Sequence, residues 1–406
     1  MPYKRFFYGK IIIFLFFCVY CPACFAQTLP FAIKSAPENI SVTLNDNRVV
    51  TFTAPGYRGI QIPWDYLPVK NGLLEIKLEP SETRLDYLAE YRTGIQPKSV
   101  YFSPDGSRIF VPLLGQGGID VFVRDIRPGH PELLVFEKRL SAPGGLSAGN
   151  VEALADARRR ELWVSNMEEN KVHIYDLDTL EYKTGFSTGG IFPKVIVQNP
   201  EGNITVVSNW ISRNISVFDS DSRELLRRIP VGGTPRGMAF SPDGNFLYVA
   251  NFDEALIEVI DMTLNRVTRT FRLYEGEGAC RHVIYHDNKL FVSDMYRGTV
   301  NILNASTGAL LVSRRIGPNI NTIVLSPDGK WVFASSRGRN NPEDYTIPGP
   351  DFGGVFMLDS QDLSVVQRVW GRNQPTGLAV SPDGNYLVFS DFLDANLEIY
   401  AIDPPW

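Results

Sequence analysis

Cysteine is scarce in this chain of 406 residues, which contains four. Three of them, Cys18, Cys21 and Cys24, lie within the first 26 residues, so the rest of the chain keeps only Cys280. If the first 26 residues are removed as a signal peptide, the single remaining cysteine excludes an intramolecular disulfide, and stability must then come from a hydrophobic core. We interpret Cys280 as a small buried residue rather than a reactive thiol.

Apolar runs long enough to span a bilayer are also lacking. The run 11–19 is too short, follows a basic start, and is followed by Cys24-Phe25-Ala26, with small residues at the two positions that signal peptidase reads. We therefore predict a signal peptide over 1–26 and export of residues 27–406 as a soluble protein of the bacterial envelope, periplasmic or extracellular. An uncleaved anchor and a lipoprotein are the alternatives.

An excess of positive charge is missing as well. The chain has 40 basic and 45 acidic residues, and a cleaved 1–26 segment would remove three basic residues and no acidic one, leaving a net charge of −8. A mildly acidic protein is no general match to nucleic acid or an anionic membrane surface. Any site for anions must therefore be a local patch.

Histidine is equally rare, with four residues at positions 130, 173, 282 and 286. No two of them have the spacing of metal ligands, and the haem attachment pattern Cys-x-x-Cys-His is absent. We expect no cofactor on this ground. Cofactor chemistry would have to reside on a partner.

What the chain has in abundance is a repeat of roughly 44 residues built from short apolar strands and Pro-Asp-Gly turns. Its clearest copy spans 234–271, and Ser-Pro-Asp-Gly also occurs at 103–106, 326–329 and 381–384. Proline sets φ at the turn and glycine supplies the positive φ that other residues resist. Four antiparallel strands per repeat predict an all-β fold, a β-propeller that forms one domain over 27–406.

The number of blades depends on the N-terminal region. The repeats are clear over 94–403, whereas 27–93 reads either as a divergent first blade or as an extension. We favour eight blades over seven, with Leu29 to Ser35 supplying the last missing strand. In the seven-blade alternative, Arg84 to Tyr91 closes the ring.

The strands of the repeat resemble a known family. Tyr248-Val249-Ala250-Asn251, followed by Val259-Ile260-Asp261, is similar to the YVTN-type repeat of YncE-like secreted bacterial propellers. Trp163 to Asn166 and Val206 to Asn209 match the same pattern. The resemblance implies a propeller and a binding or surface protein without an agreed reaction.

The repeat register predicts which residues gather on one face of the disc, because the start of each first strand and the end of each second strand lie there. Counting back five residues from each first turn gives one residue per blade: Ile40, Lys98, Asn150, Lys194, Arg236, Arg281, Asn321 and Thr376. The second strands end at Thr53, Leu113, Asn166, Asn209, Asn251, Asp294, Ser336 and Asp391. The register therefore predicts a basic mouth surrounded by amides and carboxylates.

We expect this mouth to bind an anionic small molecule through Lys98, Lys194, Arg236 and Arg281, with Asn166, Asn209, Asn251 and Trp210 around them. The alternative is that the cations pair with nearby carboxylates and that the asparagines tie loops together. Aromatic residues follow the second strands at Trp210, Phe252, Tyr296 and Phe392, which would allow single-stranded nucleic acid to stack, although the acidic net charge disfavours it. An insertion over 337–352 leaves from the same face and reads as a lid or a docking loop for a protein partner.

Candidates for catalysis are few. Arg281, His282 and Asp294 form the best cluster, similar to the His and Arg groups of secreted lactonase propellers, with His282 as general base. Adjacent strand residues point to opposite faces, which separates Arg281 from His282. Asn166, Asn209, Asp294 and Asp391 could supply oxygen ligands for Ca²⁺, but four nearby cations disfavour a metal.

We therefore favour a non-catalytic binding or scaffold protein with its site at the basic mouth. The alternatives are a lactonase-like hydrolase and a redox-enzyme subunit whose cofactor is carried by a partner. A carboxylate or histidine aligned with two arginines at the centre of the disc would favour the hydrolase.

Overall fold

The computed structural model describes residues 31–36, 40–46, 48–54, 57, 59–78, 84–124 and 134–402. The expected signal peptide over 1–26 and His130 lie outside these residues. The described chain divides into two compact units, of which the first ends at Arg84 and the second begins at Leu85. Each unit has its own sheets and its own core.

The first unit consists of two three-stranded sheets. Its elements are β1 (Ala32–Ala36), β2 (Ser41–Leu44), β3 (Val49–Thr53), β4 (Ile60–Pro63), the 3-10 turn η1 (Trp64–Tyr66), β5 (Val69–Lys70) and β6 (Leu73–Lys77). One sheet has the order β1-β6-β5 and the other β2-β3-β4. Phe52 and Leu74 are fully buried in the core that these sheets share.

The second unit consists of four-stranded antiparallel sheets, which we call blades A to G. Blade A contains β8 (Tyr101–Phe102), β9 (Arg108–Pro112), β10 (Ile119–Arg124) and β11 (Leu134–Leu140). Blade B contains β12 (Asn150–Asp156), β13 (Glu161–Asn166), β14 (Lys171–Asp176) and β15 (Tyr182–Ser187). Blade C contains β16 (Pro193–Gln198), β17 (Ile204–Asn209), β18 (Asn214–Asp219) and β19 (Leu225–Pro230).

The remaining blades repeat this plan. Blade D contains β20 (Pro235–Phe240), β21 (Phe246–Asn251), β22 (Leu256–Asp261) and β23 (Arg266–Arg272). Blade E contains β24 (Cys280–His286), β25 (Lys289–Asp294), β26 (Thr299–Asn304) and β27 (Leu310–Arg315). Blade F contains β28 (Ile320–Leu325), β29 (Trp331–Ser336), β30 (Gly354–Asp359) and β31 (Val365–Trp370). Blade G contains β32 (Pro375–Val380), β33 (Tyr386–Asp391), β34 (Asn396–Ile402) and, as its outer strand, β7 (Leu85–Arg92).

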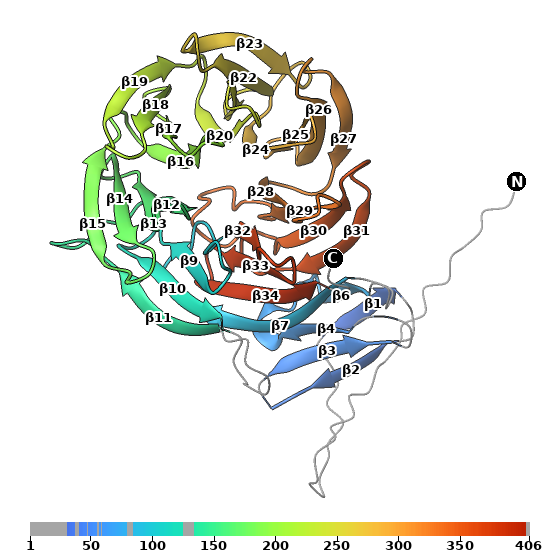
Figure 1. Ribbon diagram of the computed structural model, residues 1–406. Coiled ribbons are helices and arrows are strands. Elements are labelled where there is room, and N and C mark those ends of the chain that lie inside the picture. The colour runs from blue at the N-terminus through green and yellow to red at the C-terminus, as the bar shows by residue number, and fades with distance from the viewer. Residues whose placement is uncertain are drawn as a thin grey trace, which may run out of the picture. The chain divides into compact units, whose positions relative to one another are not determined.

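The second unit is therefore a β-propeller, as predicted, and Figure 1 shows its blades arranged around a common centre with the first strand of each blade innermost. Seven four-stranded blades occur within the described residues, so the preference for eight was wrong. The outer strand of blade G is β7, which pairs antiparallel with β34 from Leu85 to Arg92. The eight-blade prediction assigned Leu29 to Ser35 to that position, but the described strand there, β1, pairs in parallel with β6. The chain before Arg84 is an extension.

The predicted turns fold as their residue types require. In the copy at 103–106 the backbone N–H of Gly106 donates to the Ser103 carbonyl at 2.8 Å, and Gly106 has a φ of +70°. The Ser103 hydroxyl accepts from the N–H of Arg108 at 2.9 Å and donates to the Asp105 carboxylate. The copies at Ser241, Ser326 and Ser381 form the same bonds.

The blades pack face to face through apolar residues of their middle strands. Val206 and Val217 of blade C are fully buried against Leu247 and Val249 of blade D, and similar clusters join the other neighbours. Burial of such residues stabilises the fold by about 25 cal/mol for each Å² of apolar surface that is removed from water. In the part of the chain that the structure describes, Cys280 is a free cysteine, so this packing rather than a disulfide holds the blades together.

Serine side chains join the first strands of neighbouring blades near the centre. The Ser208 hydroxyl of blade C accepts from the N–H of Val195 in its own blade at 3.1 Å and donates to the carbonyl of Arg236 in blade D at 3.0 Å. Ser293 and Ser335 make the equivalent bonds to the carbonyls of Asn321 and Thr376. Each serine thus satisfies backbone groups that the innermost strands leave unpaired.

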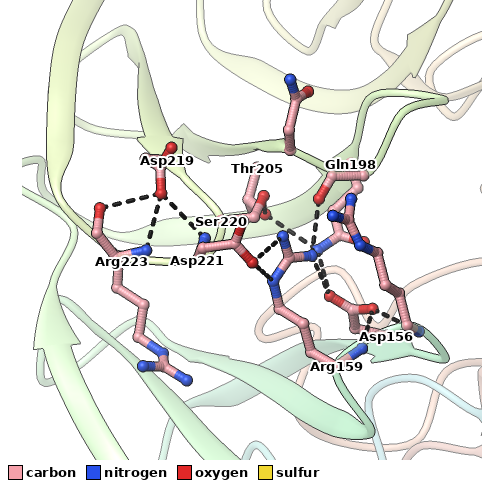
Figure 2. A network of polar contacts seen from close by, with 12 residues as sticks. Asp156, Arg159, Gln198, Thr205, Asp219, Ser220, Asp221 and Arg223 are labelled. Atoms are coloured by element: carbon pink, nitrogen blue, oxygen red, sulfur yellow. Dashed lines mark hydrogen bonds and ion pairs between the residues drawn. The ribbon is translucent and has the colours of Figure 1, made fainter.

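Blade B lacks the Pro-Asp-Gly sequence at its first turn. An ion-pair network at the turn that stands in its place holds blade B to blade C (Figure 2). The buried Asp156 carboxylate accepts from Arg159 Nη1 at 2.9 Å and from Gln198 Nε2 at 2.8 Å. Arg159 also donates to the Gly202 carbonyl at 2.7 Å and pairs with Asp221. The degenerate turn is therefore stabilised by contacts to the neighbouring blade.

Among the residues that the structure describes, no helix has the length and hydrophobicity needed to cross a bilayer.

Candidate functional site

The first strand of every blade carries one extra residue near its start. In blade E, Cys280 pairs with Asp294 and His282 pairs with Ser293, so Arg281 has no partner of its own. Equivalent register shifts occur at the same place in blades B, C, D, F and G. In blade A, Pro97 pairs with Leu113 and Tyr101 with Phe110, which again leaves one extra residue. Such β-bulges bend the strand and re-aim side chains.

The bulge places two successive residues of each blade in the same region at the centre. The extra residues are Lys98, Val151, Lys194, Arg236, Arg281, Asn321 and Thr376, and we call them the inner ring. The residues that follow them are Ser99, Glu152, Val195, Gly237, His282, Thr322 and Gly377. The predicted ring is therefore correct in six of seven blades, and in blade B the ring residue is Val151 rather than Asn150. Ile40 belongs to the core of the first unit, outside the propeller.

Four cations of the inner ring and Arg337 lie close enough to act on one another. Desolvation and the positive charges of Arg337, Arg281, Arg236 and Lys194 hold the pKa of Lys98 well below its usual value. Burial, together with Arg236 and Arg281, lowers the pKa of Lys194 to about 7, although Glu152 and Glu168 act in the opposite direction. We call Lys98, Lys194, Arg236, Arg281 and Arg337 the central cationic cluster.

A single carboxylate, Glu152, contacts this cluster directly among the described residues. Its Oε1 accepts from Arg236 Nη2 at 2.8 Å, and the Tyr101 hydroxyl donates to its other oxygen. Burial would raise the pKa of Glu152, but Arg236 and Arg281 hold it below the ordinary value, so the group is ionised. Sequence reasoning missed Glu152 because it counted Asn150 as the ring residue. Its place next to a ring residue is the signal that identifies it.

The positive charge of Arg281 is compensated far less than that of Arg236. Its side chain is 5% exposed, and the one hydrogen bond that it makes to the described residues runs from Nη1 to the Thr322 hydroxyl at 3.5 Å. Burial, followed by the neighbouring Arg236, holds the pKa of its guanidinium well below the usual value, although Glu152 acts in the opposite direction. Arg236 Nη1 and Asn321 Nδ2, also buried, have no hydrogen-bond partner among these residues. The centre therefore presents several donors without acceptors.

Aromatic side chains form the walls around the two lysines. Lys98 Nζ lies 4.8 Å from the centroid of the Phe392 ring, and Lys194 Nζ lies 5.3 Å from that of Trp210. The Trp210 and Phe252 rings are in contact, with centroids 4.6 Å apart. These contacts favour cations but supply no counter-charge. Of the four aromatic residues named from sequence, Tyr296 is the exception, because it is 63% exposed and donates to Glu277.

The insertion over 337–352 connects β29 to β30 and begins at the cluster. The Arg337 guanidinium donates to Gln374 Oε1, while Gln374 Nε2 donates to the Tyr345 carbonyl at 2.6 Å. The Arg337 guanidinium lies 5.5 Å from the Tyr345 ring and 5.6 Å from the Phe392 ring. Arg339 pairs with Asp351 across the base of the loop. Tyr345 and its loop therefore border the cationic cluster.

The asparagines predicted to surround a ligand instead bond within their own blades. Asn166 Nδ2 donates to Asn150 Oδ1 at 3.1 Å, and its Oδ1 accepts from the N–H of Glu169 at 2.9 Å. Asn209 donates to Asn214 and Ser216, and Asn251 accepts from the N–H of Asp253. These bonds match the alternative in which the asparagines tie loops together.

The predicted catalytic cluster is only partly assembled. His282 lies near Arg281 and Glu152, because the bulge overrides the alternation that was expected to separate Arg281 from His282. Burial lowers the pKa of His282 to about 4, which makes it neutral at pH 7. Asp294 belongs to a different environment, where it accepts from Tyr274 and from the N–H groups of Ala279 and Arg297.

The two weak metal candidates, Asp294 and Asp391, lie in blades E and G and bond to their own loops. Asp391 Oδ1 accepts from the N–H of Arg372 at 2.9 Å. Within the described ranges, no three His, Cys, Asp or Glu side chains are grouped to hold a metal ion. Cys280 is buried, and burial raises the pKa of its thiol to about 12, so it is a core residue there.

Comparison with known proteins agrees with this architecture. A family described as YNCE-like beta-propeller matches residues 87–245, and one described as Lactonase, 7-bladed beta-propeller matches residues 263–405. The chain is 36% identical over 397 residues to antigen Lp49 of Leptospira interrogans, covering 93% of this chain and 84% of the antigen. The chain belongs to the YNCE-like β-propeller family.

More distant relatives of this YNCE-like propeller share parts of its length. The seven-bladed beta-propeller protein Rv1057 of Mycobacterium tuberculosis is 26% identical over 158 residues, which cover 38% of this chain and 39% of that protein. The 6-phosphogluconolactonase of Formosa agariphila is 21% identical over 252 residues, which cover 53% of this chain and 68% of the enzyme. Identity at this level supports the shared fold and leaves activity to be argued from the site.

Proposed function

We propose that this propeller is a binding protein that holds a small anionic ligand, a carboxylate or a phosphate, in the central cationic cluster. The observation that carries the proposal is Arg281, a buried guanidinium whose one hydrogen bond to the described residues is to the Thr322 hydroxyl at 3.5 Å. An uncompensated buried charge is costly, because desolvation is not repaid by a partner. A bound anion would supply that partner.

The chemistry of the donors fits an oxyanion. Guanidinium groups present paired N–H donors in a planar fork that matches the oxygens of carboxylate or phosphate, and Arg236 Nη1 is free to contribute. Lys194 of blade C adds charge beside Arg236 of the adjacent blade D, and the faces of Phe392 and Trp210 suit the apolar part of a small ligand. A ligand with one anionic head and a compact organic body satisfies both surfaces.

Thermal unfolding in the presence of candidate ligands tests this proposal. A ligand that binds only the folded state raises the melting temperature by mass action. Residues 27–406 should be stabilised by sugar acids, sugar phosphates or inorganic phosphate, and the shift should disappear in Arg281→Met. The matched control is Arg266→Met, which removes an exposed arginine of the outer strand β23. An equal shift in the Arg281 variant contradicts the proposal.

A lactonase-like hydrolase is the second candidate, and Glu152 is the observation that favours it. An ionised carboxylate beside Arg236, with the neutral His282 nearby, could take a proton from water as the water oxygen attacks a lactone carbonyl. Arg281 would stabilise the oxyanion, and ring opening would give a hydroxy acid. Lactone hydrolysis that is lost in Glu152→Gln supports this candidate, whereas binding without turnover excludes it for the lactones tested.

We also propose that the protein is exported to the bacterial envelope. The basic start, the short apolar run and Ala26 support cleavage before Gln27, and the relative Lp49 is named as an antigen. Cell fractionation followed by mass spectrometry of the N-terminus tests this. An N-terminus at Gln27 in the exported fraction is expected, and intact Met1 in the cytoplasm contradicts it.

A further inference from the structure

Lys98 combines a reactive group with an unusual position. It is the inner-ring residue of blade A, half-buried, and its Nζ lies over the Phe392 ring at 4.8 Å. The Arg337 guanidinium approaches the same ring at 5.6 Å, so two cationic groups share one aromatic face. Within the described part of the chain, the Lys98 amine makes no ion pair or hydrogen bond.

The charges that act most strongly on the Lys98 amine oppose its protonation. They are Arg337 after β29, Arg281 on β24, Arg236 on β20 and Lys194 on β16, and the carboxylate in contact with the cluster, Glu152, is paired with Arg236. Burial acts in the same direction and, with these charges, holds the pKa of Lys98 well below its usual value. A lysine that is desolvated next to other cations keeps a free lone pair and becomes a nucleophile.

We propose that the Lys98 amine forms a reversible imine with an aldehyde or ketone that carries a phosphate or carboxylate group. This inference rests on the proposed function, because the anionic group of that ligand would be held by Arg236 and Arg281. One cluster then binds the anionic group of the ligand and supplies the nucleophile that attacks its carbonyl group. A carbonyl compound without an anionic group lacks the first of these contacts.

The step balances without an oxidant or reductant. The Lys98 nitrogen attacks the carbonyl carbon, a C–N bond forms, and the carbonyl π pair moves to oxygen, which takes the proton released from nitrogen. Loss of that hydroxyl with the remaining amine proton releases one water and leaves the C=N bond. Arg281, whose positive charge acts on Lys98, would stabilise the oxyanion while it forms.

Lys194 is the competing lysine, and its surroundings make it the weaker nucleophile. Two carboxylates, Glu152 and Glu168, act on Lys194 and favour its protonated form, whereas the charges that act most strongly on Lys98 are all positive. Lys194 Nζ also contacts Met167 Sδ. We therefore assign the imine to Lys98 and leave Lys194 as a cation that contacts the anion.

Pyridoxal 5′-phosphate is a suitable probe, because it carries an aldehyde and a phosphate on one small ring. The full chain 27–406 is incubated with a substoichiometric amount at pH 7, reduced with borohydride and mapped by peptide mass spectrometry. We expect the label on Lys98, at least ten-fold more than with pyridoxal, and a decrease when inorganic phosphate competes. Equal labelling by pyridoxal, or a label mainly on Lys194 or on surface lysines, overturns the assignment.

Two variants separate this inference from the proposed function. Lys98→Arg removes the primary amine and should lose the label, whereas Lys138→Arg on the exposed strand β11 should keep the label on Lys98. If phosphate binds the wild-type protein but Lys98 remains unmodified, the imine is wrong and the anion site stands. If phosphate does not bind at all, the proposed function itself fails.

Discussion

Arg236 and Glu152 form an ion pair across the centre of the propeller, with Nη2 and Oε1 2.8 Å apart. Glu152 lies on β12 of blade B and Arg236 on β20 of blade D, so the pair bridges two blades that are not neighbours. The Tyr101 hydroxyl of blade A donates to the same carboxylate. Glu152 thus connects three blades at the point where the cations converge.

Replacing Glu152 with glutamine should destabilise the protein and strengthen anion binding. Breaking a buried ion pair leaves its partner uncompensated, and we expect a loss of about 3 kcal/mol in the free energy of unfolding. The cluster also loses its one contacting carboxylate, so inorganic phosphate should bind more tightly. Chemical denaturation and phosphate titration measure the two effects. Asp253→Asn, which breaks the exposed pair with Arg213, should change stability by less than about 0.5 kcal/mol.

Arg281→Met should have the opposite effect on stability. The substitution removes a buried charge without a carboxylate partner and keeps an apolar chain in its place. Replacement of buried charges by apolar residues is often stabilising, by about 1–4 kcal/mol. We expect a higher melting temperature without ligand and no ligand-induced shift. A destabilised variant would mean that Arg281 supports the fold through contacts beyond Thr322.

The lowered pKa of Lys194 predicts a rise in stability with pH. The folded protein releases the Lys194 proton near pH 7, whereas the unfolded chain keeps it to about pH 10.4. Below pH 7 Lys194 is protonated in both the folded and the unfolded state, so its buried charge destabilises the fold in full. This destabilisation is relieved as the pH rises from 7 towards 10. The slope from this group approaches about 1.4 kcal/mol per pH unit. The difference in unfolding free energy between wild type and Lys194→Met should increase with that sign, and a flat difference would contradict the prediction.

Ser208→Ala should weaken the junction between blades C and D. The hydroxyl bridges the N–H of Val195 and the carbonyl of Arg236, and its loss leaves both buried groups without that partner. The expected cost is about 1–3 kcal/mol in unfolding free energy, measured by denaturant titration. Ser222→Ala, in an exposed turn of the same blade, is the control. Equal stability of the two variants would show that water replaces the bridge.

Truncation distinguishes the extension from the propeller. A chain that begins at Arg84 keeps β7 and every blade, so it should unfold in one cooperative transition with its own core intact. A chain that begins at Thr93 lacks β7 and exposes the edge of β34, so it should aggregate or lose cooperativity. Circular dichroism and size-exclusion chromatography compare the two. Collapse of the longer chain would mean that residues before Arg84 are needed for the propeller.

The sequence was sufficient for the repeat, its turns and most of the inner ring. Ser-Pro-Asp-Gly strongly favours one turn conformation. Counting a fixed number of residues back from the first turn of each blade located Lys98, Lys194, Arg236 and Arg281. The count was off by one residue in blade B, where Ala155 to Arg158 replaces the usual turn. Because of that shift, Asn150 was named as the ring residue and Glu152 was not identified.

Two other features depended on pairing that a single sequence does not specify. Strict alternation of side chains along a strand predicts that Arg281 and His282 point to opposite faces. The bulge after Cys280 brings both towards Glu152, and no residue type in that strand indicates the bulge. The blade number depended on which segment pairs with β34. Arg84 to Tyr91 and residues 29–35 are both plausible strands, and the register from Leu85 to Arg92 decides between them.

Calorimetric titration of inorganic phosphate into residues 27–406 at pH 7 tests whether the central cationic cluster binds an anion. We expect one site per chain, an affinity that weakens with added salt, and loss of binding in Arg281→Met but not in Arg266→Met. Binding that survives in Arg281→Met, or that is lost equally in both variants, would contradict a site at the central cationic cluster.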